Sequence, residues 1–154
     1  MTRNAEAYSL VEAILIVLFI GIFAAIAIPR LNFAVISKHK AETTAKKIVT
    51  DLRRTRRMAI SDAANNNKGF ELNMTGGGPH DSYQIENCDT HEVLEVHEID
   101  SSVSVNCSNS KKFSFEPLGN RKGAENGNIT VSAEGKTFTI TVVPATGMIK
   151  CTEN

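Results

Sequence analysis

Near its start the chain has one long apolar run. From Leu10 to Ile28 every residue is apolar except Glu12 and Gly21, and Pro29-Arg30 closes the run. A helix needs about 20 apolar residues to cross the hydrocarbon core of a bilayer. The run therefore predicts a membrane-spanning helix. The Glu12 carboxylate inside it needs an explanation, because an ionised group in hydrocarbon costs about 2.5–3.5 kcal/mol on insertion scales and usually has a partner.

A second helical pattern follows Pro29 and extends to about residue 64, where Asn65-Asn66-Asn67 and Gly69 end it. Small and apolar residues recur at spacings of three, four and seven, which marks one face of a helix. The face consists of Ala34, Ala41, Ala45, Ile48, Leu52, Thr55, Ala59 and Ala63. Because these side chains are mostly small, we expect the face to pack closely on a sheet. Proline lacks the backbone N–H, so one long helix with a kink or local melting at Pro29 is expected.

From Gly69 onward the pattern changes to short alternating segments separated by Gly, Pro and Asn turns, which is typical of strands. The expected strands are 70–74, 82–88, 93–99, 103–107, 112–116, 128–132 and 136–143, with a short last strand ending at Cys151. The buried positions of the hairpin formed by 128–143 are predicted to be Ile129, Val131, Phe138, Ile140 and Val142. The fold class is therefore α+β, with a long N-terminal helix, a transmembrane half plus an amphipathic half, packed on a C-terminal antiparallel β domain.

The charges cancel overall but are segregated along the chain. There are 17 Lys and Arg against 17 Asp and Glu among 154 residues, so no net charge selects nucleic acid or acidic lipid. Residues 30–57 are strongly basic, whereas 86–100 are acidic. The simplest interpretation is two solvated faces of opposite sign, and contact between them, within or between subunits, stays open.

The start of the apolar run carries a recognisable motif. Ala7-Tyr8-Ser9-Leu10-Val11-Glu12 has a small residue, an aromatic residue and a glutamate four positions later, and Pro29 follows the run. This combination resembles the processing and methylation motif of type IV prepilins and type II secretion pseudopilins. The family usually has glycine in place of Ala7, and Arg3 is the only leader cation here. A free amine at Tyr8, above all one from a neighbouring subunit, would be a suitable partner for Glu12.

The resemblance implies four segments and a location. The first is a leader, residues 1–7, which is removed by a prepilin peptidase that also N-methylates Tyr8. The second, residues 8–29, spans the inner membrane once and directs assembly. The amphipathic half of the helix follows over 30–64, and the periplasmic β domain over 65–154. The implied partners are other pilin-like or pseudopilin subunits, the peptidase/N-methyltransferase and inner-membrane lipid. The mature subunit would be incorporated into a pseudopilus or pilus.

The cysteines are interpreted in that setting. In an oxidising compartment, two of Cys88, Cys107 and Cys151 are expected to form a disulfide, and the sequence does not say which two. Cys88-Asp-Thr-His91 also has the spacing of metal ligands, with His97 and Cys107 further on, but a second closely spaced pair is missing. We therefore expect a disulfide, no metal and no cofactor.

A second resemblance narrows the family. Phe115-Glu-Pro117-Leu-Gly119, the hairpin and Thr146-Gly147-Met148-Ile149 resemble the C-terminal pattern of the GspH/FimT group of minor pseudopilins and minor pilins. That group has a long N-terminal helix backed by β-sheets. No catalytic motif is found, and the four histidines are expected to be solvated. The main hypothesis is a non-enzymatic minor pseudopilin of a type II secretion pseudopilus, which acts in protein secretion across the outer membrane.

The alternative is a FimT/FimU-like minor pilin of a type IV pilus that binds DNA during uptake. A basic cluster supports it, formed by Arg53, Arg54, Arg56 and Arg57. In the family, DNA binding is associated with a basic C-terminal tail, and here the tail has Lys150 balanced by Glu153. Nucleic acid is therefore a weak candidate partner that stays open.

The first prediction concerns processing. After expression with a prepilin peptidase, the mature chain should begin at N-methylated Tyr8, since Ala7 is small enough for a peptidase pocket. Intact mass measures the loss of residues 1–7 and the added methyl group. A chain that keeps its leader under these conditions would contradict the prediction.

Overall fold

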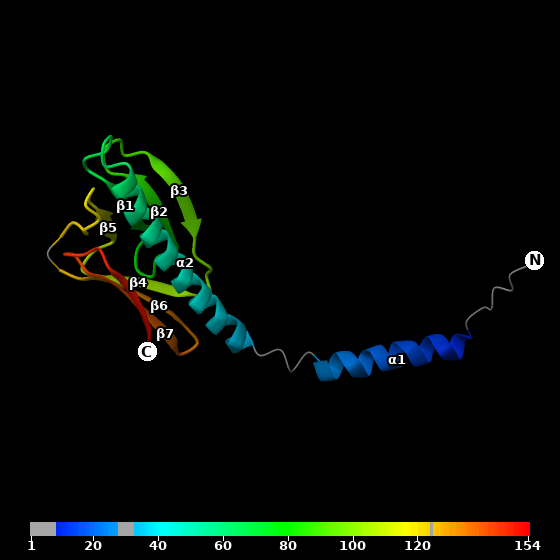
Figure 1. Cartoon of the computed structure of the whole chain (residues 1–154). Coiled ribbons are helices and arrows are strands. Elements are labelled where there is room, and N and C mark those ends of the chain that lie inside the picture. Colours follow the sequence, from blue (N-terminus) through cyan, green and yellow to red (C-terminus); the bar gives the residue numbers. More distant parts are fainter. Residues whose placement is uncertain (1–8, 28–32, 124) are drawn as a thin grey trace, which may run out of the picture. The chain divides into compact units, whose positions relative to one another are not determined.

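An apolar helix, α1 (Leu10–Ala27), comes first in the computed structural model, which describes residues 9–27, 33–123 and 125–154 (Figure 1). The helix belongs to its own unit, Met1–Phe33, and the rest of the chain forms a second unit, Ala34–Asn154. In the described part of the chain no helix is long and apolar enough to cross a membrane. The span predicted over 8–29 is longer than α1 at both ends, and its residues 8, 28 and 29, with the predicted kink at Pro29, lie outside the described residues.

The amphipathic helix is α2 (Phe33–Ser61), which packs on the β domain through its predicted face. Six of the eight predicted positions are buried; Ala34 is half-buried and Ala63 is exposed. The helix ends before the predicted residue 64, because the Asp62 carbonyl accepts the N–H groups of Asn65, at 3.0 Å, and Asn66, at 2.8 Å, in a turn. The predicted packing face is thus confirmed, and the predicted C-terminus is three residues too late.

Eight strands follow in the described part of the second unit, close to the predicted ranges. They are β1 (Phe70–Thr75), β2 (Ser82–Asn87), β3 (Val93–Glu98), β4 (Ser104–Ser108), β5 (Lys112–Phe115), β6 (Gly127–Ala133), β7 (Lys136–Val142) and β8 (Ile149–Glu153). They form two antiparallel sheets, one with the order β3-β2-β1-β5 and the other with the order β4-β6-β7-β8. We call them the first and second sheet. The α+β class and the antiparallel domain are confirmed.

Helix α2 lies against the two sheets (Figure 1). Each sheet contributes buried apolar side chains to a common core with the helix. The first sheet contributes residues such as Leu72 and Phe113, and the helix contributes Ile48 and Leu52. The second sheet contributes the five hairpin positions predicted to be buried, which are all buried: Ile129, Val131, Phe138, Ile140 and Val142. Alternation along β6 and β7 therefore places every second side chain against the helix.

The predicted disulfide is not formed: all three cysteines, Cys88, Cys107 and Cys151, are free thiols. Cys107 and Cys151 lie in one cross-strand row, in which Cys107 faces Ile129 on β6 and Cys151 faces Ile140 on β7. Three strand spacings separate the two cysteines, or about 14 Å, whereas a disulfide needs Cα atoms within about 7 Å. Cys88 follows β2 in the other sheet, so the topology keeps the three thiols apart.

The second prediction concerns the core. A fragment beginning at Arg30 should unfold cooperatively by circular dichroism, because the face of α2 still covers both sheets. Ile48→Asp should abolish that transition, since Ile48 is fully buried and an unpaired buried charge costs several kcal/mol. Thr50→Asp, on the exposed side of the same helix, is the matched control and should keep it. An Ile48→Asp fragment that melts like the control would contradict the packing.

Candidate functional site

The described apolar helix, taken by itself, has no side that is covered. Its large side chains are all substantially exposed, from 46% for Leu15 to 76% for Leu10. A helix that is apolar on all sides requires lipid or other apolar helices around it. Glu12 lies in its first turn, where the unsatisfied N–H groups and the helix dipole favour a negative charge. The proposed cleavage and methylation sites, Ala7 and Tyr8, lie outside the described residues.

The basic half of α2 and the acidic strand β3 meet within one subunit. The Arg54 guanidinium forms an ion pair with the Glu95 carboxylate at 2.6 Å, and the Lys40 ammonium forms one with Asp100 at 2.8 Å. Hydrogen bonds from these cations lower the pKa of the Glu95 and Asp100 carboxyls. The sequence left open whether the basic and acidic segments contact each other. Part of their charge is paired within one subunit. Glu95 faces the helix, although the acidic segment 86–100 was expected to be a solvated face.

Arg56 has a structural role at the meeting point of three segments. Its Nε donates to the Gly119 carbonyl at 2.7 Å, and its Nη2 donates to the Thr146 carbonyl at 3.2 Å. Gly147 has a positive φ of 61°, and a Cβ there would lie 1.9 Å from the Gly119 oxygen. We call Arg56, Gly119, Thr146 and Gly147 the Arg56 junction. It requires glycine at 147 because the backbone of the turn before β8 lies against that of the turn after β5.

The other two arginines of the basic cluster are exposed. Arg53 and Arg57 form no ion pair with any described residue, and they line a shallow groove of about 440 Å³ together with the segment 146–149. The four predicted arginines therefore do not act as one patch: Arg54 neutralises Glu95, Arg56 holds the two turns, and only Arg53 and Arg57 offer free charge. This division could not be predicted from the spacing of the basic residues.

A buried polar network joins α2 to the first sheet. The Tyr83 hydroxyl donates to the Asp51 carboxylate at 2.5 Å, and His97 Nε2 lies 3.7 Å from Asp51 Oδ2 and 3.3 Å from Glu95 Oε2. Burial and the neighbouring Asp51 carboxylate raise the pKa of Tyr83 well above its usual value, so the phenol keeps its proton. The His97 ring packs against the Tyr83 ring in a tilted arrangement, with centroids 5.1 Å apart and an angle of 43° between the ring planes. The network fixes β3 against the helix and has no exposed nucleophile.

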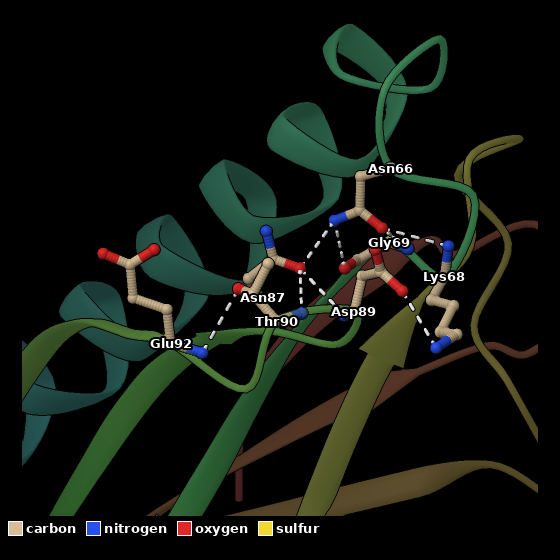
Figure 2. A network of polar contacts seen from close by, with 7 residues as sticks. All are labelled: Asn66, Lys68, Gly69, Asn87, Asp89, Thr90 and Glu92. Carbon is tan, nitrogen blue, oxygen red and sulfur yellow. Dashed lines mark hydrogen bonds and ion pairs between the residues drawn. The ribbon is translucent and has the colours of Figure 1, made fainter.

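A second polar network holds the turn between α2 and β1 (Figure 2). Asn66 is buried; its amide nitrogen donates to the Gly69 carbonyl at 2.8 Å and to Asn87 Oδ1 at 2.9 Å, and its oxygen accepts from the Gly69 N–H at 2.8 Å. Lys68 and Asp89 form an ion pair at 2.8 Å beside it. The asparagine run thus does more than end the helix, because Asn66 ties that turn to the turn after β2.

The histidines and Cys88 do not converge on a metal. No group of three or more His, Cys, Asp or Glu residues able to hold an ion occurs among the described residues. Cys88 lies against Glu71 instead, and burial and that carboxylate raise the pKa of its thiol to about 11. The expectation that all four histidines are solvated is wrong for His80, which is buried with Nδ1 3.0 Å from the Thr75 oxygen, and for half-buried His97.

Solved structures with the same arrangement come from one protein in two crystal forms. The type IV minor pilin FimU of Pseudomonas aeruginosa PAO1, in space group P21, aligns over 74% of this chain and 89% of that chain, with a TM-score of 0.62 and 12% identity. The form in space group P65 aligns over 72% and 91%, with a TM-score of 0.59 and 13% identity. This chain has a minor-pilin fold. No family model matches the sequence, and no curated protein matches it.

The minor-pilin fold gives the sequence resemblance a structural meaning. Gly119 and Gly147, two turn residues of the C-terminal pattern, are the glycines of the Arg56 junction. Asp51 and Tyr83 were missed by the sequence analysis, because a single aspartate on a basic helix and a single tyrosine in a strand give no signal of their pairing. Only the topology brings them together.

The third prediction tests the Arg56 junction. Gly147→Ala should destabilise the fragment by about 3 kcal/mol or more, because the new Cβ collides with the Gly119 carbonyl and breaks the hydrogen bonds of Arg56. Gly135→Ala is the matched control: φ is also positive, 77°, but nothing lies within 4 Å of the added Cβ. Its cost should be about 1 kcal/mol. Urea denaturation measures both, and equal losses would contradict the close approach.

The fourth prediction concerns nucleic acid. Two exposed arginines should give weak, sequence-independent binding of duplex DNA, with a log–log salt slope of about −2. Fluorescence anisotropy at two salt concentrations measures it, and Arg53→Gln with Arg57→Gln should abolish it. Sub-micromolar affinity at physiological salt would show that the weak binding predicted here is wrong.

Proposed function

We propose that this chain is a minor-pilin-type structural subunit of a type IV pilus. The observation that carries the proposal is the likeness to FimU, which extends over 89% of that protein's resolved chain. The apolar helix and the motif Ala7-Tyr8 with Glu12 support it independently, because they belong to the part of a pilin that is processed and assembled. The chain acts in this proposal by occupying a position in a filament, without catalysis.

The uncovered apolar surface of α1 is the part of the chain that neighbouring subunits would cover in the filament. Burying its exposed apolar side chains among equivalent helices of neighbouring subunits is favourable by about 25 cal/mol for each Å² removed from water. In lipid that gain is absent, and packing and polar contacts decide which helices associate. Glu12 then provides selectivity, because its charge is tolerated in an apolar bundle only where a partner such as the Tyr8 amine of the next subunit neutralises it.

A type II secretion pseudopilin, the main hypothesis from the sequence, would need the same helix and the same type of β domain. The structural likeness to a pilus protein favours the pilus, and the difference between the two machines lies in their other components. Before assembly, the proposal keeps the inner-membrane location implied by the sequence motif.

The fifth prediction tests the assembly role in cells that make the filament. Glu12→Ala should leave the amount of membrane-associated protein unchanged or higher, since removing a charge from hydrocarbon is favourable by about 2.5–3.5 kcal/mol. Its amount in the sheared filament fraction should fall strongly. Glu12→Gln keeps the shape without the charge and should behave like Glu12→Ala, whereas Ser9→Ala, at the adjacent start of α1, is the control that should assemble. Wild-type incorporation of Glu12→Gln would show that the charge is not required.

Deletion of the gene distinguishes the two machines. A pilus subunit should be needed for normal numbers of surface pili, with secretion of folded exoproteins intact. The opposite result, normal pili with exoproteins retained in the periplasm, would replace the pilus proposal by the pseudopilus one.

A further inference from the structure

Strand β3 presents an apolar and acidic surface at the edge of the first sheet. It pairs with β2 on one side only, and three of its apolar side chains are exposed: Val93 at 44%, Leu94 at 39% and Val96 at 62%. Glu92 and Glu98 flank them, are exposed, and form no ion pair with any described residue. Figure 2 shows the Glu92 carboxylate directed away from the neighbouring polar network. We call Glu92, Val93, Leu94, Val96 and Glu98 the strand surface.

Edge strands of this kind usually need protection against pairing with other chains. Charges provide part of it here, but Glu95 is already used internally by Arg54, and the three apolar side chains remain uncovered in the single subunit. The strand surface therefore has the composition of a contact region, with an apolar centre and charges at its ends.

The groove beside Arg53 and Arg57 has the complementary composition. The two free guanidinium groups adjoin exposed apolar side chains, with Met148 at 44% in the groove lining, and Ile60 at 44% against Gly119. Leu118, the residue before Gly119, is 91% exposed. We call Arg53, Arg57, Ile60, Leu118 and Met148 the groove surface. It also adjoins β8, the free edge of the second sheet.

One copy cannot join its own two surfaces. Its β3 is held against α2 by the Arg54–Glu95 ion pair and the Asp51–His97 contact, whereas its groove opens between α2 and the segment 146–149. The two surfaces thus lie on different flanks of α2. A contact between them must join two molecules, and it leaves one surface of each kind free, as in a head-to-tail interface that continues into a chain of subunits.

We propose that the strand surface of one copy docks on the groove surface of a second copy of this chain. Glu92 and Glu98 meet the unpaired arginines, the apolar side chains of β3 cover Met148, Ile60 and Leu118, and two free sheet edges come together. Charge complementarity sets the orientation, because the acidic surface is repelled by another acidic surface. The proposal goes beyond the pilus function and does not depend on it, since purified protein tests it without a filament machine.

Cross-linking of the purified full chain in detergent at low salt tests the contact. One copy carries Val96→Cys with Cys151→Ser and a first tag; the other keeps native Cys151, exposed on β8, and has a second tag. A short bismaleimide should join the two tags. Cys88 and Cys107 are half-buried with thiol pKa values of about 11, so they react slowly near neutral pH. Ser108→Cys, exposed on β4 at the opposite edge of the second sheet, replaces Val96→Cys in the control.

The expected result is a doubly tagged adduct from Val96→Cys and none above background from Ser108→Cys. Arg53→Gln with Arg57→Gln in the second copy should lower the yield about tenfold, and Glu92→Gln with Glu98→Gln in the first copy should do the same. Molar salt should also lower it, because the Debye length falls to about 3 Å. Lys38→Gln with Lys46→Gln in the second copy should leave it unchanged. Both lysines are exposed on α2 outside the two surfaces. Burial raises the pKa of the Cys151 thiol, and Lys46, like Arg53, is a cation that lowers it.

Three results would each overturn the proposal. Equal yields from the two cysteine positions would show association through the apolar helix in the micelle alone. A cross-linking yield that neither pair of charge variants lowers would show that charge complementarity does not hold the two copies together. An equal decrease in yield with the lysine control would show that the arginine effect is unspecific attraction between charges.

Discussion

Burial of one face of α2 against both sheets is the contact on which the unit Ala34–Asn154 depends. Each antiparallel sheet has one apolar face, and neither could remain in water with that face exposed. Alanines at 41, 45 and 59 let the helix backbone come close, while Ile48 and Leu52 fill the space between the sheets. The helix is therefore the shared core element, and a single charge in its buried face acts on both sheets at once.

Polar contacts then fix the elements around that core in one arrangement. Arg54 and Asp51 hold the first sheet, Glu42 pairs with Lys136 of β7 at 3.7 Å, and Arg56 holds the two turns that carry Gly119 and Gly147. Exposed ion pairs contribute little to stability, typically below about 1 kcal/mol. The buried Asp51–Tyr83 bond and the close backbone approach at Gly147 matter more, because breaking either leaves an unsatisfied group or a collision.

Periodicity in the sequence was sufficient for the elements and their buried faces, because those depend on short-range spacing. The five hairpin positions between Ile129 and Val142 and the six helix positions between Ala41 and Ala59 were predicted in this way, and they are buried. Contacts between distant residues were not predictable. The arginines of 53–57 look alike in the sequence, yet the fold gives them three different environments, and the cysteines looked like a disulfide until the strand order separated them. The sequence showed that basic and acidic residues are segregated, but which of them remain unpaired depends on how β3 packs on α2.

The two units of the chain meet the solvent in different ways, and the proposed assembly would make use of this difference. The β domain, with α2, covers its own core and pairs part of its charge within the subunit. Helix α1, taken by itself, is apolar all round, so it is stable only among lipids or other helices. Association through α1 alone would be strong but poorly selective, because apolar helices resemble one another. In the two proposals made above, selectivity comes from charged groups: Glu12 on the helix, and the separated acidic and basic surfaces on the two flanks of α2.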